Sequence, residues 1–154
     1  MPRPTRALPD RVRQPDAVFP RGVARACCVA LLAVLLAAGC KRESAEADAV
    51  RAAAAAFLAD QHQADWQAAF ARLHPGMRLR CGSAARLATT VEEAGALPRA
   101  WRFDAPLVRR YTAELTGVVT PAGGSDSALR LAFDQEDGHW LVTAWALGAR
   151  ELCP

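Results

Sequence analysis

The sequence predicts an α+β fold, in which N-terminal helices pack on an antiparallel sheet. Between residues 44 and 95, apolar side chains recur at steps of three and four, which is the helical period. After Pro106 they alternate with polar side chains, which is the strand period. Helices followed by a run of strands are typical of an α+β domain, and 154 residues provide for one domain.

An uncharged run near the N-terminus predicts that the chain is exported from the cytoplasm. Residues 26–40 carry no charge and follow a basic segment at residues 21–25. A membrane-spanning helix needs about 18 or more apolar residues, so this run fits a cleaved signal peptide better than a permanent anchor. We predict a signal peptide with a long N-terminal region over residues 1–39, a tether over 40–43 and a domain over 44–154.

Three helices are expected at the start of the domain, each with a capping residue before its apolar stripe. Ser44, Asp65 and Ser83 supply the caps. The second helix is expected to end at residues 74–76 (His-Pro-Gly) and the third at Gly95. The stripes are Ala47, Val50, Ala54, Phe57 and Leu58 in the first helix, Trp66, Ala69, Phe70 and Leu73 in the second, and Leu87, Val91 and Ala94 in the third.

A meander of three strands is expected to follow. Its first strand covers residues 111–119 and its second covers 129–133. The Glu-Asp-Gly sequence at residues 136–138 is a tight-turn signal. The third strand begins at residue 140 and is apolar on both faces, and residues 101–103 form a short edge strand.

The end of the uncharged run, Leu-Ala-Ala-Gly-Cys at residues 36–40, resembles the lipobox of bacterial lipoproteins. The resemblance implies that Cys40 is acylated and holds the protein on the periplasmic side of a bilayer. The family prefers Leu where this chain has Ala37, and these small residues also suit an ordinary signal peptidase. In the enteric pattern an Asp after the cysteine directs retention in the inner membrane, so Lys41 implies the outer membrane.

Cysteine counting agrees with acylation. Two of the five cysteines precede residue 40 and leave with the leader. Three then remain, an odd number in an oxidising compartment. Acylation of Cys40 leaves Cys81 and Cys153, for which we predict a disulfide bond. Two separate buried thiols are the alternative.

The order of the elements resembles the NTF2-like superfamily, whose helices pack into a strongly curved sheet to form a cone. The stretch DWQAAFARLHP at residues 65–75 and the stretch EDGHW at residues 136–140 carry the resemblance, which spans most of residues 44–148. The resemblance implies a cone, and strand alternation predicts the side chains that line it. This candidate pocket comprises Tyr111, Leu115, Val119, Leu131, Phe133 and Val142.

Charge and motif spacing argue against several functions. Residues 1–39 hold six Arg against two Asp, whereas the rest of the chain holds 13 Lys and Arg against 14 Asp and Glu. The mature domain therefore lacks the basic stripe that nucleic-acid binding needs. His62, His74 and His139 lack the spacing of zinc ligands, and the chain has no G-x-S-x-G or phosphate-binding loop. We expect neither a metal nor a cofactor.

Acid–base catalysis is the enzymatic alternative. NTF2-like enzymes such as the ketosteroid isomerases place an Asp base and Tyr or Asp donors inside the cone. Such a site here would need Asp104, Glu114 or Asp134 to lie beside Tyr111. Alternation predicts that Tyr111 points inward and that Glu114 and Asp134 point to solvent, so we find no residue-by-residue match.

Three function classes remain. We prefer a non-catalytic accessory or binding lipoprotein that faces the periplasm and contacts an envelope protein. A carrier of a small apolar ligand and an acid–base enzyme are the alternatives. Trp145 bears on this choice, because it lies either under the helices or on an exposed surface that binds a partner.

Overall fold

The computed structural model describes residues 44–153. The predicted signal peptide, Cys40 and the tether lie outside the described residues. Across residues 44–153, no helix combines the length and the apolar character needed to span a membrane. The helices are a first helix over residues 44–62, α2 (Trp66–Ala71), α3 (Pro75–Cys81) and α4 (Ala84–Glu93). The strands are β1 (Pro98–Phe103), β2 (Leu107–Arg109), β3 (Thr112–Pro121), β4 (Ser127–Glu136), β5 (His139–Leu147) and β6 (Arg150–Glu151).

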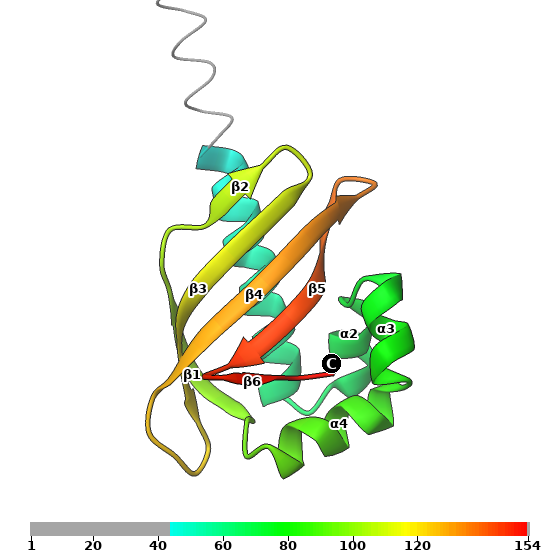
Figure 1. Ribbon diagram of the computed structural model, residues 1–154, viewed down its shortest axis with the longest axis vertical. Coiled ribbons are helices and arrows are strands. Elements are labelled where there is room, and N and C mark those ends of the chain that lie inside the picture. Colours follow the sequence, from blue (N-terminus) through cyan, green and yellow to red (C-terminus); the bar gives the residue numbers. More distant parts are fainter. Residues whose placement is uncertain (1–43, 154) are drawn as a thin grey trace, which may run out of the picture. The chain divides into compact units, whose positions relative to one another are not determined.

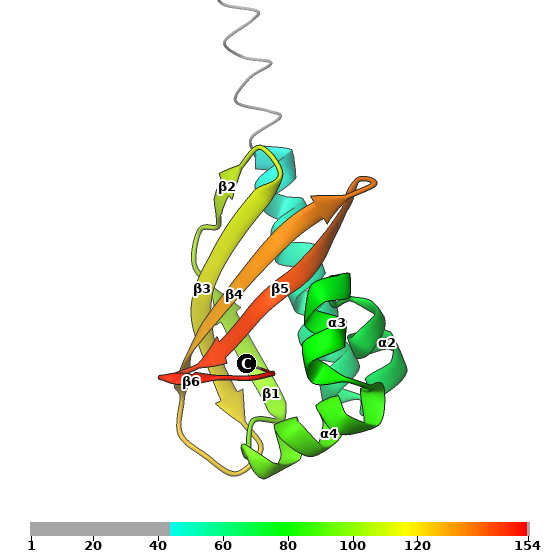
Figure 2. The ribbon, with the colours of Figure 1, turned by 45° about the vertical axis from the view of Figure 1, so that its right-hand side comes forward.

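The predicted α+β class is confirmed. The strands form one antiparallel sheet in the order β1-β3-β4-β5-β6, and β2 pairs with β3 beyond the end of β1. The first helix lies against one face of this sheet, while α2, α3 and α4 gather beside β5 (Figures 1 and 2). The sheet does not close on itself, since β1 and β6 are at its two ends.

Two of the three predicted caps, Asp65 and Ser83, are found where the sequence places them. The side chain of Asp65 accepts a hydrogen bond from the Ala68 N–H, and that of Ser83 accepts one from the Arg86 N–H. The expectation that residues 74–76 only end the second helix is incomplete, because they also begin α3. Proline suits the first position of a helix, where its missing N–H would have no partner. His74 caps α3 by accepting the Gly76 N–H at Nδ1.

A β-bulge in β5 explains why both faces of that strand are apolar in sequence. Phe133 pairs with Val142 and Ala132 pairs with Ala144, so Thr143 has no partner in β4. An extra residue reverses the alternation that follows it. Val142 and Trp145 therefore share the core face although one position number is even and the other odd. Trp145 is 1% exposed, which places it under the helices.

The outer edge of β5 is covered by three parts of the chain. The link between α2 and α3 lies beside the first half of the strand, where the His74 N–H donates to the Val142 carbonyl and the Val142 N–H donates to the Arg72 carbonyl. The Arg80 guanidinium donates to the carbonyl of the bulged Thr143. β6 pairs with the last residues of β5. The edge is thus satisfied by the protein itself, which prevents pairing with another chain.

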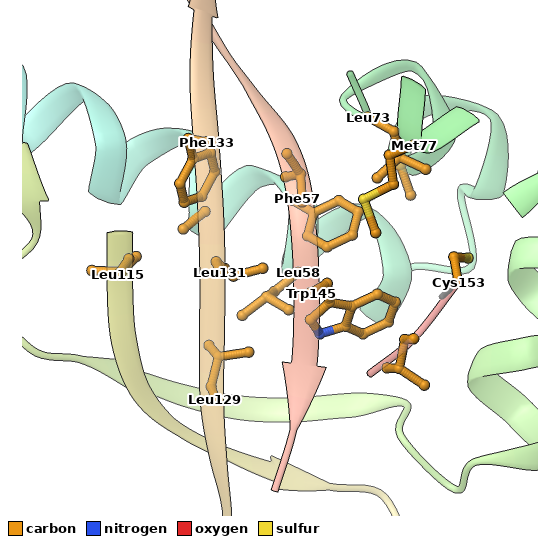
Figure 3. Packing of buried hydrophobic residues seen from close by; sticks show 14 of the residues in the cluster. Phe57, Leu58, Leu73, Met77, Leu115, Leu129, Leu131, Phe133, Trp145 and Cys153 are labelled. Atoms are coloured by element: carbon orange, nitrogen blue, oxygen red, sulfur yellow. The ribbon is translucent and has the colours of Figure 1, made fainter. Parts of the chain in front are cut away.

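The core lies between the sheet and the first helix. Phe57 from the helix and Trp145 from β5 meet edge to face, with ring centroids 5.3 Å apart. Leu115, Leu131 and Trp145 come from three neighbouring strands and point to the same side of the sheet (Figure 3). This layer is the apolar surface whose burial favours folding.

The predicted disulfide between Cys81 and Cys153 is confirmed. It joins the end of α3 to the segment after β6, and its Cα atoms are 4.9 Å apart. Both cysteines are buried, as is the adjacent Leu152. The bond therefore fastens the helical layer to the edge of the sheet at β5.

Candidate functional site

Most of the side chains that the sequence predicts to line a pocket are instead part of the packed core. Five of the six predicted residues are at most 1% exposed and belong to one core cluster, namely Leu115, Val119, Leu131, Phe133 and Val142. They pack with Phe57 and Leu58 of the first helix, as Figure 3 shows for Leu115, Leu131 and Phe133. The strand alternation predicted their common face correctly.

The expectation that Tyr111 points inward is wrong. Tyr111 is 56% exposed and lies in the two-residue turn between Arg109 of β2 and Thr112 of β3, which pair directly. The turn takes the residue out of the pleat, so alternation no longer applies to it. Arg110 adopts a positive φ of 38° there, and its guanidinium lies over the Tyr111 ring at 5.0 Å from the centroid.

Among the described residues, none of the acidic side chains considered for catalysis forms a hydrogen bond with Tyr111, although Asp134 pairs with the next residue, Thr112. Asp104 and Glu114 are exposed, and Asp134 is half-buried. Asp104 accepts a hydrogen bond of 2.7 Å from the Thr116 hydroxyl. Glu114 and Asp134 lie on the sheet face opposite the core, as alternation predicted. The described residues therefore place no carboxylate within an apolar cone.

The three histidines occupy separate positions. His62 ends the first helix, and its Nδ1 donates to the Pro98 carbonyl at 2.9 Å. His74 accepts the Gly76 N–H at Nδ1, so Nε2 carries the proton that is donated to Glu136 at 3.0 Å. Within residues 44–153 no three potential metal ligands come together. Two of the histidines thus connect helix ends to the sheet.

A shallow hollow lies on the outer face of the sheet. Its volume is about 250 Å³, and Arg130 lies at its rim together with Glu114 and Glu151. Alanines of β4 and β5 form its floor, at positions 132, 144 and 146. The mixture of one cation with two anions can hold a polar group, but it provides no paired nucleophile and base.

A larger groove runs between the first helix, α2 and the start of β5. Its volume is about 610 Å³. We call it the alanine groove; it is lined by Ala49, Ala52, Ala53, Ala68, Ala71, Arg72, Gly138, His139, Trp140 and Leu141. Small side chains allow a partner to approach the backbone closely, and the half-buried Leu141 offers apolar contact. Arg72 is held by an ion pair with Asp60.

Sequence reasoning missed two further features of the site region. Arg80 bonds to carbonyls on β5 and at Cys153, but it lies in a segment for which no element was expected. Gln61 is completely buried, and neither its amide oxygen nor its amide nitrogen has a hydrogen-bond partner among the described residues. The sequence does carry a signal for the burial of Gln61. It lies four residues after Phe57 and therefore on the core face of the first helix.

No family model, curated protein or solved structure matches this chain.

Proposed function

We propose that the protein is a lipoprotein of the bacterial cell envelope, anchored by an acylated Cys40, whose domain is a non-catalytic binding module facing the periplasm. The pairing of Cys81 with Cys153 carries this proposal. With these two cysteines joined, Cys40 is the single cysteine without a partner after removal of residues 1–39. A thiol at the end of a lipobox-like run is the group that lipoprotein maturation uses, and acylation accounts for it.

The surface supports binding rather than carriage of a ligand in a cone. Five of the six side chains predicted to line a cone belong to the packed core, whereas the alanine groove is open and mostly lined by apolar side chains. We propose this groove as the contact surface for an envelope protein. An acid–base enzyme is less favoured, because Asp104 and Glu114 lie in solvent.

The finer fold assignment, an NTF2-like cone, also stays a proposal. The order of helices before an antiparallel meander supports it. The basic residue Lys41 after the cysteine favours the outer membrane as the location.

Metabolic labelling with palmitate tests the anchor. The full-length chain is expected to incorporate the label and to partition into the detergent phase of a Triton X-114 extract. Cys40→Ala should abolish both properties, because the thioether to the lipid cannot form. The double variant Cys81→Ser/Cys153→Ser is the matched control, since it removes cysteines without touching the anchor. Equal labelling of wild type and Cys40→Ala would contradict the proposal.

A further inference from the structure

The β2–β3 hairpin presents an apolar and basic surface to solvent. Leu107 is 51% exposed and Tyr111 is 56% exposed. Of the large apolar side chains in residues 44–153, only these two and Leu79 are exposed to this degree. Two of the three therefore lie in one five-residue stretch. We call this stretch, with Arg109 and Arg110 between them, the hairpin tip.

The charges of the hairpin tip are available to a partner. Arg109 and Arg110 are both exposed, and within residues 44–153 neither forms an ion pair. The Arg110 guanidinium stacks on Tyr111, which leaves its charge intact. Tyrosine, arginine and an exposed leucine together are the side chains that settle at a lipid–water interface, with apolar parts inward and charges at the headgroups.

The hairpin tip lies at the end of the domain where the first helix begins. In both Figure 1 and Figure 2 the start of the first helix and the β2–β3 turn are at the same end of the long axis. Cys40 is four residues before Ser44, so the chain between them reaches at most about 14 Å. An acylated Cys40 therefore keeps this end close to a bilayer. The three residues after Cys40, Lys41, Arg42 and Glu43, add a net charge of +1 (two basic residues and one acidic).

The charge of the neighbouring β4–β5 turn favours one orientation of the domain on a membrane. The turn carries Glu136 and Asp137 at the same end of the domain (Figure 1). Both are exposed, and Glu136 accepts a hydrogen bond from His74. A negatively charged surface attracts the hairpin tip and repels this turn, so it selects one tilt of the domain.

We propose that the hairpin tip is a second membrane contact, which binds the headgroup region of an anionic phospholipid bilayer and fixes the orientation of the domain on it. This proposal rests on the anchoring at Cys40. Its consequence is that the alanine groove and the outer sheet face are held at a defined angle to the membrane, rather than moving freely on the tether.

Depth measurement by fluorescence quenching tests the proposal. The acylated mature chain carries an environment-sensitive probe at Thr112→Cys, beside the tip, or at Ser125→Cys in the β3–β4 loop at the other end. Because the remaining cysteines are acylated or paired, the probe reacts at one site. The vesicles contain phosphatidylcholine and phosphatidylglycerol at about 7:3, a ratio chosen to give a negative surface, with spin-labelled headgroup-depth lipid.

We expect quenching of the probe at position 112 and little at position 125. Arg109→Glu/Arg110→Glu should release the tip, since each arginine near an anionic surface changes the equilibrium by about fivefold. The matched control Arg86→Glu/Arg99→Glu makes the same charge change at exposed positions elsewhere and should leave the quenching intact. An unchanged thermal unfolding midpoint verifies that both variants fold.

The outcomes separate this proposal from the one it rests on. If the acylated chain does not float with the vesicles in a density gradient, the proposed anchor at Cys40 is overturned, and the membrane contact with it. Intact flotation with equal quenching at positions 112 and 125 overturns the contact alone. Absence of quenching in lipid vesicles, combined with protection of the probe in native envelope membranes, also overturns it and identifies a protein as the occupant of the tip.

Discussion

Gln61 is a buried polar residue within an apolar layer. Its amide has no hydrogen-bond partner among the described residues, and its side chain is fully shielded from solvent. Burial of an unpaired amide costs about 1–3 kcal/mol. Gln61→Met has a similar shape and no polar atoms to desolvate, so it should increase the free energy of unfolding by roughly that amount.

Urea denaturation of the mature chain measures this change. Gln67→Met is the matched control, because Gln67 is exposed on α2 and its replacement should leave the midpoint unchanged. A lower midpoint for Gln61→Met would mean that the amide serves a polar partner, and would make Gln61 a functional residue.

The faces of individual residues were predictable only where the backbone is regular. Leu115, Leu131 and Phe133 are buried as their alternation predicts. Tyr111 is not, because it lies in a turn and the strand begins only at the next residue. The position of Trp145 needed the bulge at Thr143; the sequence shows only that both faces of this strand are apolar, which does not locate the extra residue. A bulge is set by packing against another strand, and the sequence of one strand alone does not contain that information.

Gly117 allows two strands to approach closely. A Cβ atom built at this position would lie 2.2 Å from the carbonyl oxygen of Arg102 in β1. The neighbour is backbone held in the β1–β3 ladder, so it cannot rotate away. Gly117→Ala should therefore lower the free energy of unfolding by about 1–3 kcal/mol, the usual cost of overpacking.

The same substitution in open space is the control for this element. Gly123 lies in the β3–β4 loop, where an added Cβ atom would have no neighbour within 4 Å, and Gly123→Ala should have little effect on thermal unfolding. Identical midpoints for the two variants would show that β1 moves to accept the methyl group, against the prediction.

Among the elements, those with a local signal were predictable. The caps Asp65 and Ser83 and the Asp-Gly turn at residues 137–138 are found as expected, the turn with positive φ at both residues. α3 was missed because its proline and glycine were interpreted as a helix stop, although a proline also begins helices. β2 and β6 are too short for a period to be seen.

At the scale of the whole molecule, the Cys81–Cys153 bond joins the end of α3 to the C-terminal segment after β6. It spans 72 residues, and the loop-entropy relation gives a stabilisation of about 4 kcal/mol. The double variant Cys81→Ser/Cys153→Ser should lose most of this in urea denaturation. Reduction of the wild type should give the same midpoint, whereas Cys40→Ala should leave it unchanged. Two free thiols in the oxidised mature domain would contradict the bond.

The candidate surfaces could not be predicted from the sequence, because they depend on how whole elements pack together. The alanine groove is the space left between two consecutive helices, the first helix and α2, and β5, which lies far from them along the chain. Its alanines appear in the sequence only as good helix formers. The position of Leu107 and Tyr111 at the end where the first helix begins depends likewise on how the sheet lies along that helix.

The covered edge of β5 has a consequence for crowding. Proteins held on a bilayer diffuse in two dimensions, where their effective concentration exceeds that in bulk solution. Strand-to-strand polymerisation rises with concentration and starts at an open edge. Here the link between α2 and α3, Arg80 and β6 occupy one edge, and the other is interrupted at Pro106 between β1 and β2. If the chain is anchored as proposed, its neighbours on the membrane can pack densely while each sheet stays separate.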